Sequence, residues 1–260
     1  MEWISHDITL WILLALMLSA FAAGFIDSVA GGGGLILVPS FILAGLPPQV
    51  ALGQEKIVST LGTTAAIRNF VRNKKVVWAA VTIGIPAGLL GAYIGAEAIL
   101  YFDPETIGKI IMAMLPIGIL LSFMPKKTKE LDQSEINPKI ILLGVPVAVL
   151  IIGFYDGFFG PGTGSFLILA LHYLLRFDLV SASATSKLFN FSSNIGALIA
   201  FTLSGNVLYM LAIPLVVMNL LGNHVGSSSA LKYGPNLIKR TLTISLTLLI
   251  GSLAYKFIIA

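Results

Sequence analysis

Apolar stretches recur along the whole chain and are separated by short polar or glycine-rich breaks. The breaks predict ten helical pieces, namely 8–26, 35–44, 48–71, 76–97 and 105–124, then 139–154, 165–176, 179–203, 207–230 and 236–258. The last three pieces in each half reach the roughly 20 residues that a helix needs to cross a bilayer. The pieces 35–44 and 165–176 are shorter, which is typical of re-entrant segments. The pattern predicts an all-α polytopic membrane protein with a broken, re-entrant helical hairpin in each half.

The two halves of the chain resemble each other at an offset of about 130 residues. The matched segments are Gly24-Phe25-Ile26-Asp27 with Gly153-Phe154-Tyr155-Asp156, Ala51-x4-Lys56 with Ala182-x4-Lys187, and Gly91-x3-Gly95 with Gly222-x3-Gly226. We therefore place a first repeat at 8–125, a charged linker at 126–138 and a second repeat at 139–260. All 260 residues are expected to form a single membrane domain.

The positive charges predict how the repeats are oriented. Twelve lysines and arginines can all lie on the cytoplasmic side, as the positive-inside tendency favours: Arg68, Arg72, Lys74, Lys75, Lys126, Lys127, Lys129, Lys139, Arg176, Lys232, Lys239 and Arg240. This placement of the basic residues requires that each hairpin enters and leaves the membrane on the same side and that three membrane crossings follow it. Three is odd, so the repeats are expected to be inverted, as in many secondary transporters, with both termini outside the cytoplasm. The alternative is an old duplication without functional symmetry.

Composition excludes several classes of function. The chain is 57% hydrophobic and 11% charged, whereas soluble domains carry about 25% charged residues. It has no cysteine, and its three histidines are scattered, so we expect no metal site, no cofactor and no enzymatic activity. No Walker motif is present, so ATP is not expected to drive this chain directly. The net charge of +4 indicates a cytoplasmic face in contact with lipid rather than a nucleic-acid partner. Assembly with further copies of the chain stays open.

Each predicted hairpin turns at a glycine-rich run. The first is Gly31-Gly32-Gly33-Gly34, and the second is Gly160-Pro161-Gly162-Thr163-Gly164-Ser165. Backbone N–H groups in hydrocarbon need a partner or a cavity. A helix that starts there offers free N–H groups and a positive dipole end, which suits an anion. The alternative is close helix packing through small residues.

Two lysines lie deep inside polar-striped helical pieces, where a charge is costly and indicates a functional site. Lys187 is followed by Asn190 and Asn194, and Lys56 by Ser59 and Thr63. These residues, together with the two glycine-rich runs, are the candidate substrate-binding groups.

Three acidic residues are candidates for coupling or for charge balance: Asp27, Glu55 and Asp156. Glu55 has no acidic match in the second half, where Ser186 stands. The alternative role for the lysines is a structural ion pair to Asp27 or Asp156, which is compatible with binding.

The segment 24–34 followed by Pro39 resembles the first signature of the TauE/SafE family of membrane permeases. The segment 153–165 resembles the second signature, and Ala184-Thr185-x-Lys187-x2-Asn190-x3-Asn194 is similar to the segment that comes after the second signature in that family. The resemblance implies a transporter of the prokaryotic inner membrane linked to sulfite, sulfonates and related organic anions. One departure is Glu55, where the family has an uncharged residue beside the lysine.

Together these patterns predict a secondary transporter that moves a small anion across the cytoplasmic membrane by alternating access. Proton coupling through one of the three acids is a further hypothesis. The alternative is an anion channel or uniporter of the same architecture.

Overall fold

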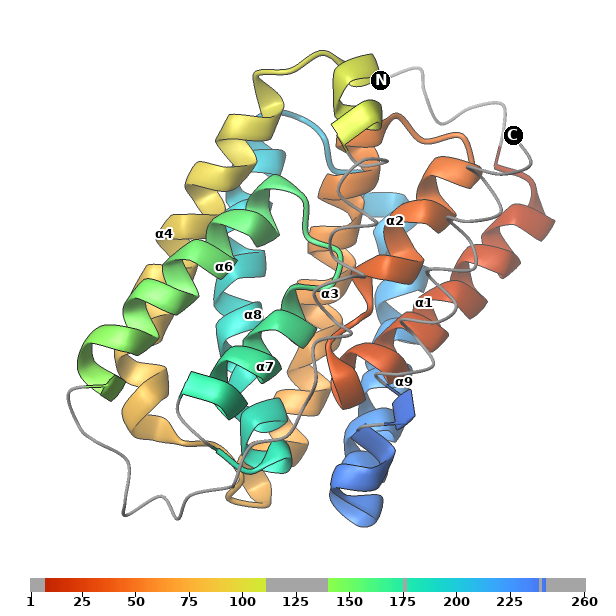
Figure 1. Ribbon diagram of the computed structural model, residues 1–260. Helices are drawn as coiled ribbons and strands as arrows, with labels where there is room; N and C mark the ends of the chain where they lie inside the picture. Colours follow the sequence, from red (N-terminus) through yellow and green to blue (C-terminus); the bar gives the residue numbers. More distant parts are fainter. Residues whose placement is uncertain (1–7, 111–139, 175–176, 239, 242–260) are drawn as a thin grey trace, which may run out of the picture.

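A computed structural model describes residues 8–110, 140–174, 177–238 and 240–241. The described residues form helices joined by short loops (Figure 1). The elements are α1 (Leu10–Ala30), α2 (Gly34–Leu43), α3 (Pro48–Arg72), α4 (Trp78–Leu100), a short π-helical turn η2 (Ile140–Gly144), α6 (Val145–Phe158), α7 (Thr163–Leu174), α8 (Leu179–Leu203) and α9 (Tyr209–Tyr233). The predicted all-α fold class is confirmed. The linker at 126–138 and most of the pieces 105–124 and 236–258 lie outside the described residues.

Helix ends follow the sequence closely where a strong local signal marks them. Pro48 opens α3, where its missing N–H has no cost. The Asp178 side chain caps α8 by accepting hydrogen bonds from the N–H groups of Val180 and Ser181. The predicted ends of α1 at 26 and α6 at 154 were wrong. Both helices continue four residues further, because no helix breaker occurs before Gly31 and Gly160, whose φ angles are +77° and +90°.

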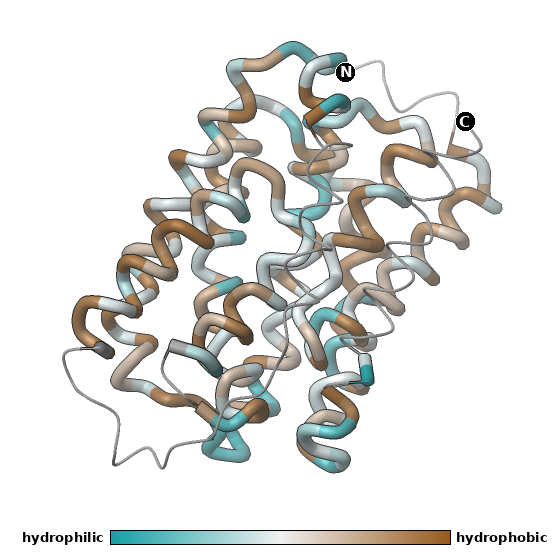
Figure 2. The backbone as a smooth tube through the Cα atoms, viewed as in Figure 1, coloured by the Kyte–Doolittle hydropathy of each residue, from teal (hydrophilic) through white to brown (hydrophobic). Residues whose placement is uncertain are grey.

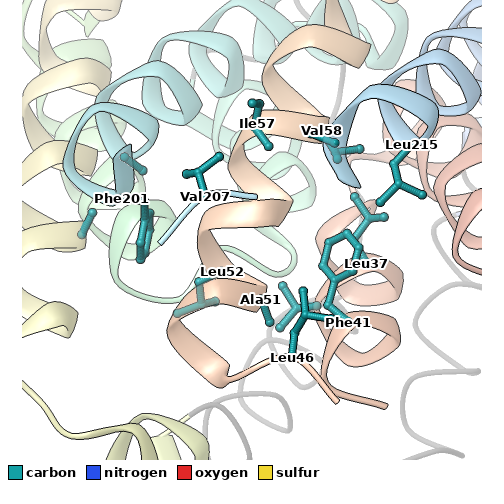
Figure 3. Packing of buried hydrophobic residues seen from close by; sticks show 14 of the residues in the cluster. Leu37, Phe41, Leu46, Ala51, Leu52, Ile57, Val58, Phe201, Val207 and Leu215 are labelled. Carbon is teal, nitrogen blue, oxygen red and sulfur yellow. The ribbon is translucent and has the colours of Figure 1, made fainter. Parts of the chain in front are cut away.

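Helix α3 passes through the centre of the packing (Figure 1). Leu52 and Val58 of α3 are fully buried, as are Leu37 and Phe41 of α2 and Leu215 of α9. Figure 3 shows these side chains grouped around α3, with Phe201 from α8 on its other side. The apolar part of α3 therefore packs against elements of both halves.

The outer surface of the helices is apolar. Large side chains such as Trp11, Leu18, Ile151 and Met210 are at least 64% exposed. In Figure 2 the most hydrophobic residues lie along the outer helices, and paler or hydrophilic ones lie at the centre and in the loops. Exposed apolar faces of this extent require lipid as solvent.

Among the residues that the structure describes, four helices are long and apolar enough to cross a membrane, by length and composition: Leu10–Ala30, Trp78–Leu100, Ile141–Phe158 and Tyr209–Tyr233. Helices α3 and α8, at 25 residues each, are as long as α9 but carry the polar stripes. The polar residues of these stripes, such as Lys56, Thr63 and Asn194, are buried in the molecule.

The helices of the two halves pack in matched pairs. Helix α4 lies against α6, and α9 lies against α1. A Cβ atom on Gly95 of α4 would be 2.1 Å from the backbone oxygen of Phe154, and one on Gly222 of α9 would be 2.1 Å from that of Phe21. In each pair of glycines, three residues separate the first from the second, so both lie on one helix face. They let the backbones of the two helices approach closely, as in other membrane helix pairs.

Two hydrogen bonds occupy corresponding positions in the two halves of the chain. The N–H of Val77, just before α4, donates to Thr185 Oγ1 of α8 over 3.1 Å. The N–H of Leu208, just before α9, donates to Gln54 Oε1 of α3, also over 3.1 Å. Each half therefore satisfies a backbone donor at the start of a helix in the other half.

Candidate anion site at the glycine-rich turns

The α1–α2 and α6–α7 turns lie in the interior of the molecule and touch each other (Figure 1). A Cβ atom on Gly31 would be 2.1 Å from the backbone of Gly164, so the contact needs glycine. The N–H of Ser165 donates to Gly31 O over 3.0 Å, and its hydroxyl donates to Ala30 O over 2.8 Å. The sequence predicts two hairpins whose tips meet with the anion between them, and in the structure the two turns touch each other directly.

The backbone N–H groups of the turns fall into two sets. Those of Gly31, Leu35, Gly160, Thr163 and Ser165 donate to backbone oxygens. Those of Gly32, Gly33 and Gly162 have no hydrogen-bond acceptor among the described residues. The second set provides the free donors that an anion needs.

Two side chains brace the second turn. The Thr163 hydroxyl, a predicted ligand, donates to Gly160 O over 2.7 Å. The Tyr155 hydroxyl donates to Pro161 O over 2.7 Å, and its ring packs edge-on against Phe159 and Phe166. Tyr155 was not singled out from sequence, because an aromatic residue beside a turn has many other uses.

The two deep lysines form ion pairs that cross between the halves. Lys56 Nζ on α3 lies 2.7 Å from Asp156 Oδ1 at the end of α6. Lys187 Nζ on α8 lies 3.0 Å from Asp27 Oδ2 at the end of α1 and also donates to the backbone oxygen of Asp27. Both lysines are at most 1% exposed. The ion pairs left open as an alternative from sequence are therefore present, and each joins one half of the chain to the other.

Further polar side chains contact the two lysine–aspartate ion pairs. Asn194 Oδ1 lies 3.2 Å from Lys56 Nζ, and Asn194 Nδ2 donates to Asn190 Oδ1 over 3.3 Å. The Thr63 hydroxyl lies 3.4 Å from Asp27 Oδ2. These three predicted residues thus belong to the lysine–aspartate network.

Ser193 is a member of the network that sequence reasoning missed. Its hydroxyl donates to Asp156 Oδ2. Its position three residues after Asn190 continues the polar stripe of α8, and this spacing was the available signal.

Glu55 lies against both turns and beside Lys56. Its Oε1 accepts a hydrogen bond from Ser59 over 2.7 Å, and its Oε2 lies 3.0 Å from Lys56 Nζ. A Cβ atom on Gly160 would be 2.8 Å from Lys56 Nζ, and one on Gly34 would be 3.4 Å from Glu55 Oε1. The two turns therefore close over this Glu–Lys pair, and glycine leaves it the room.

The site gathers cations, amides, hydroxyls and free N–H groups, which is the donor chemistry of an anion site. Among the described residues, no group of three or more histidines or acids could hold a metal ion.

Comparison with known proteins identifies the family. The family model described as "Sulfite exporter TauE/SafE" matches residues 16–253. The chain belongs to this family. It is therefore a membrane transporter, and its apolar helices are suited to membrane spans.

The similar proteins have names of the same kind. The chain is 38% identical over 255 residues to the "Probable membrane transporter protein ORF9" of Sinorhizobium sp, with 96% of this chain and 95% of that protein covered. It is 35% identical over 248 residues to the "Probable membrane transporter protein YfcA" of Escherichia coli K12, covering 94% and 90%. A "Probable membrane transporter protein" of Haemophilus influenzae is 33% identical over 250 residues, covering 96% and 97%.

Proposed function

We propose that this member of the TauE/SafE family is a secondary transporter that carries a small anion, such as sulfite or a sulfonate, across the cytoplasmic membrane by alternating access. The observation that carries the proposal is the crossed pairing of two buried lysines at the contact between the glycine-rich turns. The description of the family model supplies the substrate class.

The substrate anion replaces an aspartate as the partner of a lysine. A buried ammonium group needs a negative partner, and the carboxylate and the substrate compete for that place. The free N–H groups of Gly32, Gly33 and Gly162 then bind the anion's oxygens. Ser59, Thr63, Asn190 and Asn194 supply hydroxyl and amide groups around it.

Movement of one repeat against the other links binding to transport. Each ion pair has one partner in each half, so a rocking movement that separates the halves must break both pairs. An anion that has replaced an aspartate removes this obstacle. The substrate would thus lower the barrier to the movement that carries it across.

Opposite orientation of the repeats is part of the proposal. It is supported by the matched helix pairs, the matched hydrogen bonds at Val77 and Leu208, and the hairpins α1–α2 and α6–α7, whose turns point in opposite directions in Figure 1. In the proposed orientation the α3–α4 loop is cytoplasmic and both termini are outside.

Uptake of radiolabelled sulfite and methanesulfonate into proteoliposomes tests the site. Lys187→Ala should abolish uptake, whereas Lys109→Ala, which removes a 68% exposed lysine, should leave it unchanged. Because Lys187→Ala leaves Asp27 buried without a partner, the variant Lys187→Ala with Asp27→Asn provides a neutral centre that inserts and folds. Normal uptake by either Lys187 variant would reject the site.

A further inference from the structure

The buried charges at the turns do not balance. Among the described residues, the buried aspartate, glutamate and lysine side chains are all in this site: Asp27, Glu55, Lys56, Asp156 and Lys187. Three are carboxyl groups and two are ammonium groups. With every group ionised, the site carries one surplus negative charge.

Glu55 is the surplus carboxyl group. Asp156 holds Lys56 with a 2.7 Å hydrogen bond and is itself supported by Ser193. Glu55 Oε2 lies 3.0 Å from the same ammonium group but is buried without a hydrogen bond. Lys56 therefore lies between two carboxyl groups, and its single positive charge can compensate only one of them fully. Burial of an uncompensated charge costs several kcal/mol, and binding a proton avoids this cost.

The surroundings of Glu55 can accommodate a proton. The Ser59 hydroxyl donates to Oε1 in this structure and can rotate to accept, since a hydroxyl has both capacities. The uncharged oxygen Oε2 then remains beside Lys56. The elements packed against the carboxyl group are the turns at Gly34 and Gly160, which bring no side-chain charge. Its charged neighbours are Lys56 and Asp156.

The second half of the protein has no equivalent group. Ser186 precedes Lys187 as Glu55 precedes Lys56, and its hydroxyl donates to Ser183 O over 2.8 Å. The crossed ion pairs are duplicated, but the extra carboxyl group occurs once. The charge imbalance is therefore one per molecule.

We propose that Glu55 is the proton-binding group of this transporter and that one proton travels with each monovalent anion. The inference rests on the proposed function. A proton moves from water to the Glu55 carboxylate on the side of entry and returns to water on the side of exit. When Glu55 is protonated, the five groups are neutral together, and the entering anion adds a single negative charge. When Glu55 is ionised, the anion would meet a site that is already negative and would be repelled.

Transport by proteoliposomes measures the coupling. Methanesulfonate is the first probe because its charge does not change with pH, and sulfite is the second. The outer pH is fixed and only the inner pH is varied. With one proton per anion, an inside-alkaline gradient of one pH unit should raise accumulation about tenfold in the unmodified protein. In Glu55→Gln the same gradient should leave accumulation unchanged, while anion exchange without a gradient continues. Glu97→Gln on α4, outside the network, is the matched control and should keep the tenfold response.

Infrared spectroscopy tests the proton itself without relying on transport. The unmodified protein at neutral pH should show the C=O stretching band of a protonated carboxyl group, and Glu55→Gln should lack it, whereas Glu97→Gln should keep it. Absence of a band assignable to Glu55, or a gradient response that survives in Glu55→Gln, would overturn the inference. If the Glu55 band is present but the protein transports neither methanesulfonate nor sulfite, the proposed substrate class is rejected and the proton-binding role of Glu55 is supported.

Discussion

Lys56 on α3 and Asp156 in the last turn of α6 are 100 residues apart in the chain, yet Lys56 Nζ lies 2.7 Å from Asp156 Oδ1. Lys187 and Asp27 form the matching pair in the reverse direction between the repeats. Hydrocarbon outside the protein cannot compensate a separated charge, so each pair holds the two halves together until another ion replaces a partner.

The first prediction concerns the strength of this link. Asp27→Asn should lower the free energy of unfolding in detergent by about 3–5 kcal/mol, because it leaves the Lys187 ammonium group buried without its carboxylate partner. The variant Asp27→Asn with Lys187→Met should recover most of the loss, since no unpaired charge remains in this pair. Additive losses in the double-mutant cycle would contradict the direct pairing.

The second prediction concerns the inverted orientation. The chain has no cysteine, so single introduced cysteines can be labelled without background. Asn73 and Ser204 are the matched C-terminal caps of α3 and α8, and both are exposed. A membrane-impermeant maleimide should label Ser204→Cys from outside intact cells and Asn73→Cys only after permeabilisation. Labelling of both from the same side would refute inverted repeats.

The third prediction concerns the glycine contacts between helices. Gly95→Ala places a methyl group 2.1 Å from the backbone oxygen of Phe154, which forces α4 away from α6. Overpacking of this kind costs about 1–3 kcal/mol in free energy of unfolding. Gly108→Ala is the control, because its methyl group would meet Pro48 at an ordinary 3.7 Å. Equal stability of the two variants would mean that α4 and α6 do not pack this closely.

The fourth prediction separates a carrier from a channel. The glycine-rich turns touch through Gly31 and Ser165, so substrate passage requires the halves to move for every anion. Purified protein in a planar bilayer with sulfite on both sides should therefore give no unitary currents, while the same preparation shows slow uptake in vesicles. Discrete channel openings that disappear in Lys187→Ala would favour the channel instead.

The sequence predicted most of the described helices well, because helices depend on local patterns. The predicted pieces 48–71 and 179–203 agree closely with α3 and α8. The ends of α1 and α6 were predicted four residues early, and the residues missed include Asp27 and Asp156, each of which pairs with a lysine from the other half of the chain. That lysine is distant in sequence, so no local pattern announces it.

The sequence by itself determined that this protein is helical and apolar on its outside, and it placed lysines, carboxyl groups and glycine turns at matched positions of its two halves. Only the tertiary structure decided that Lys56 takes Asp156, that Lys187 takes Asp27, and that Glu55 is left beside an occupied partner. The physical reason is that periodicity places a side chain on a helix face, whereas charge pairing acts over a few ångströms between helices whose packing the linear pattern does not specify.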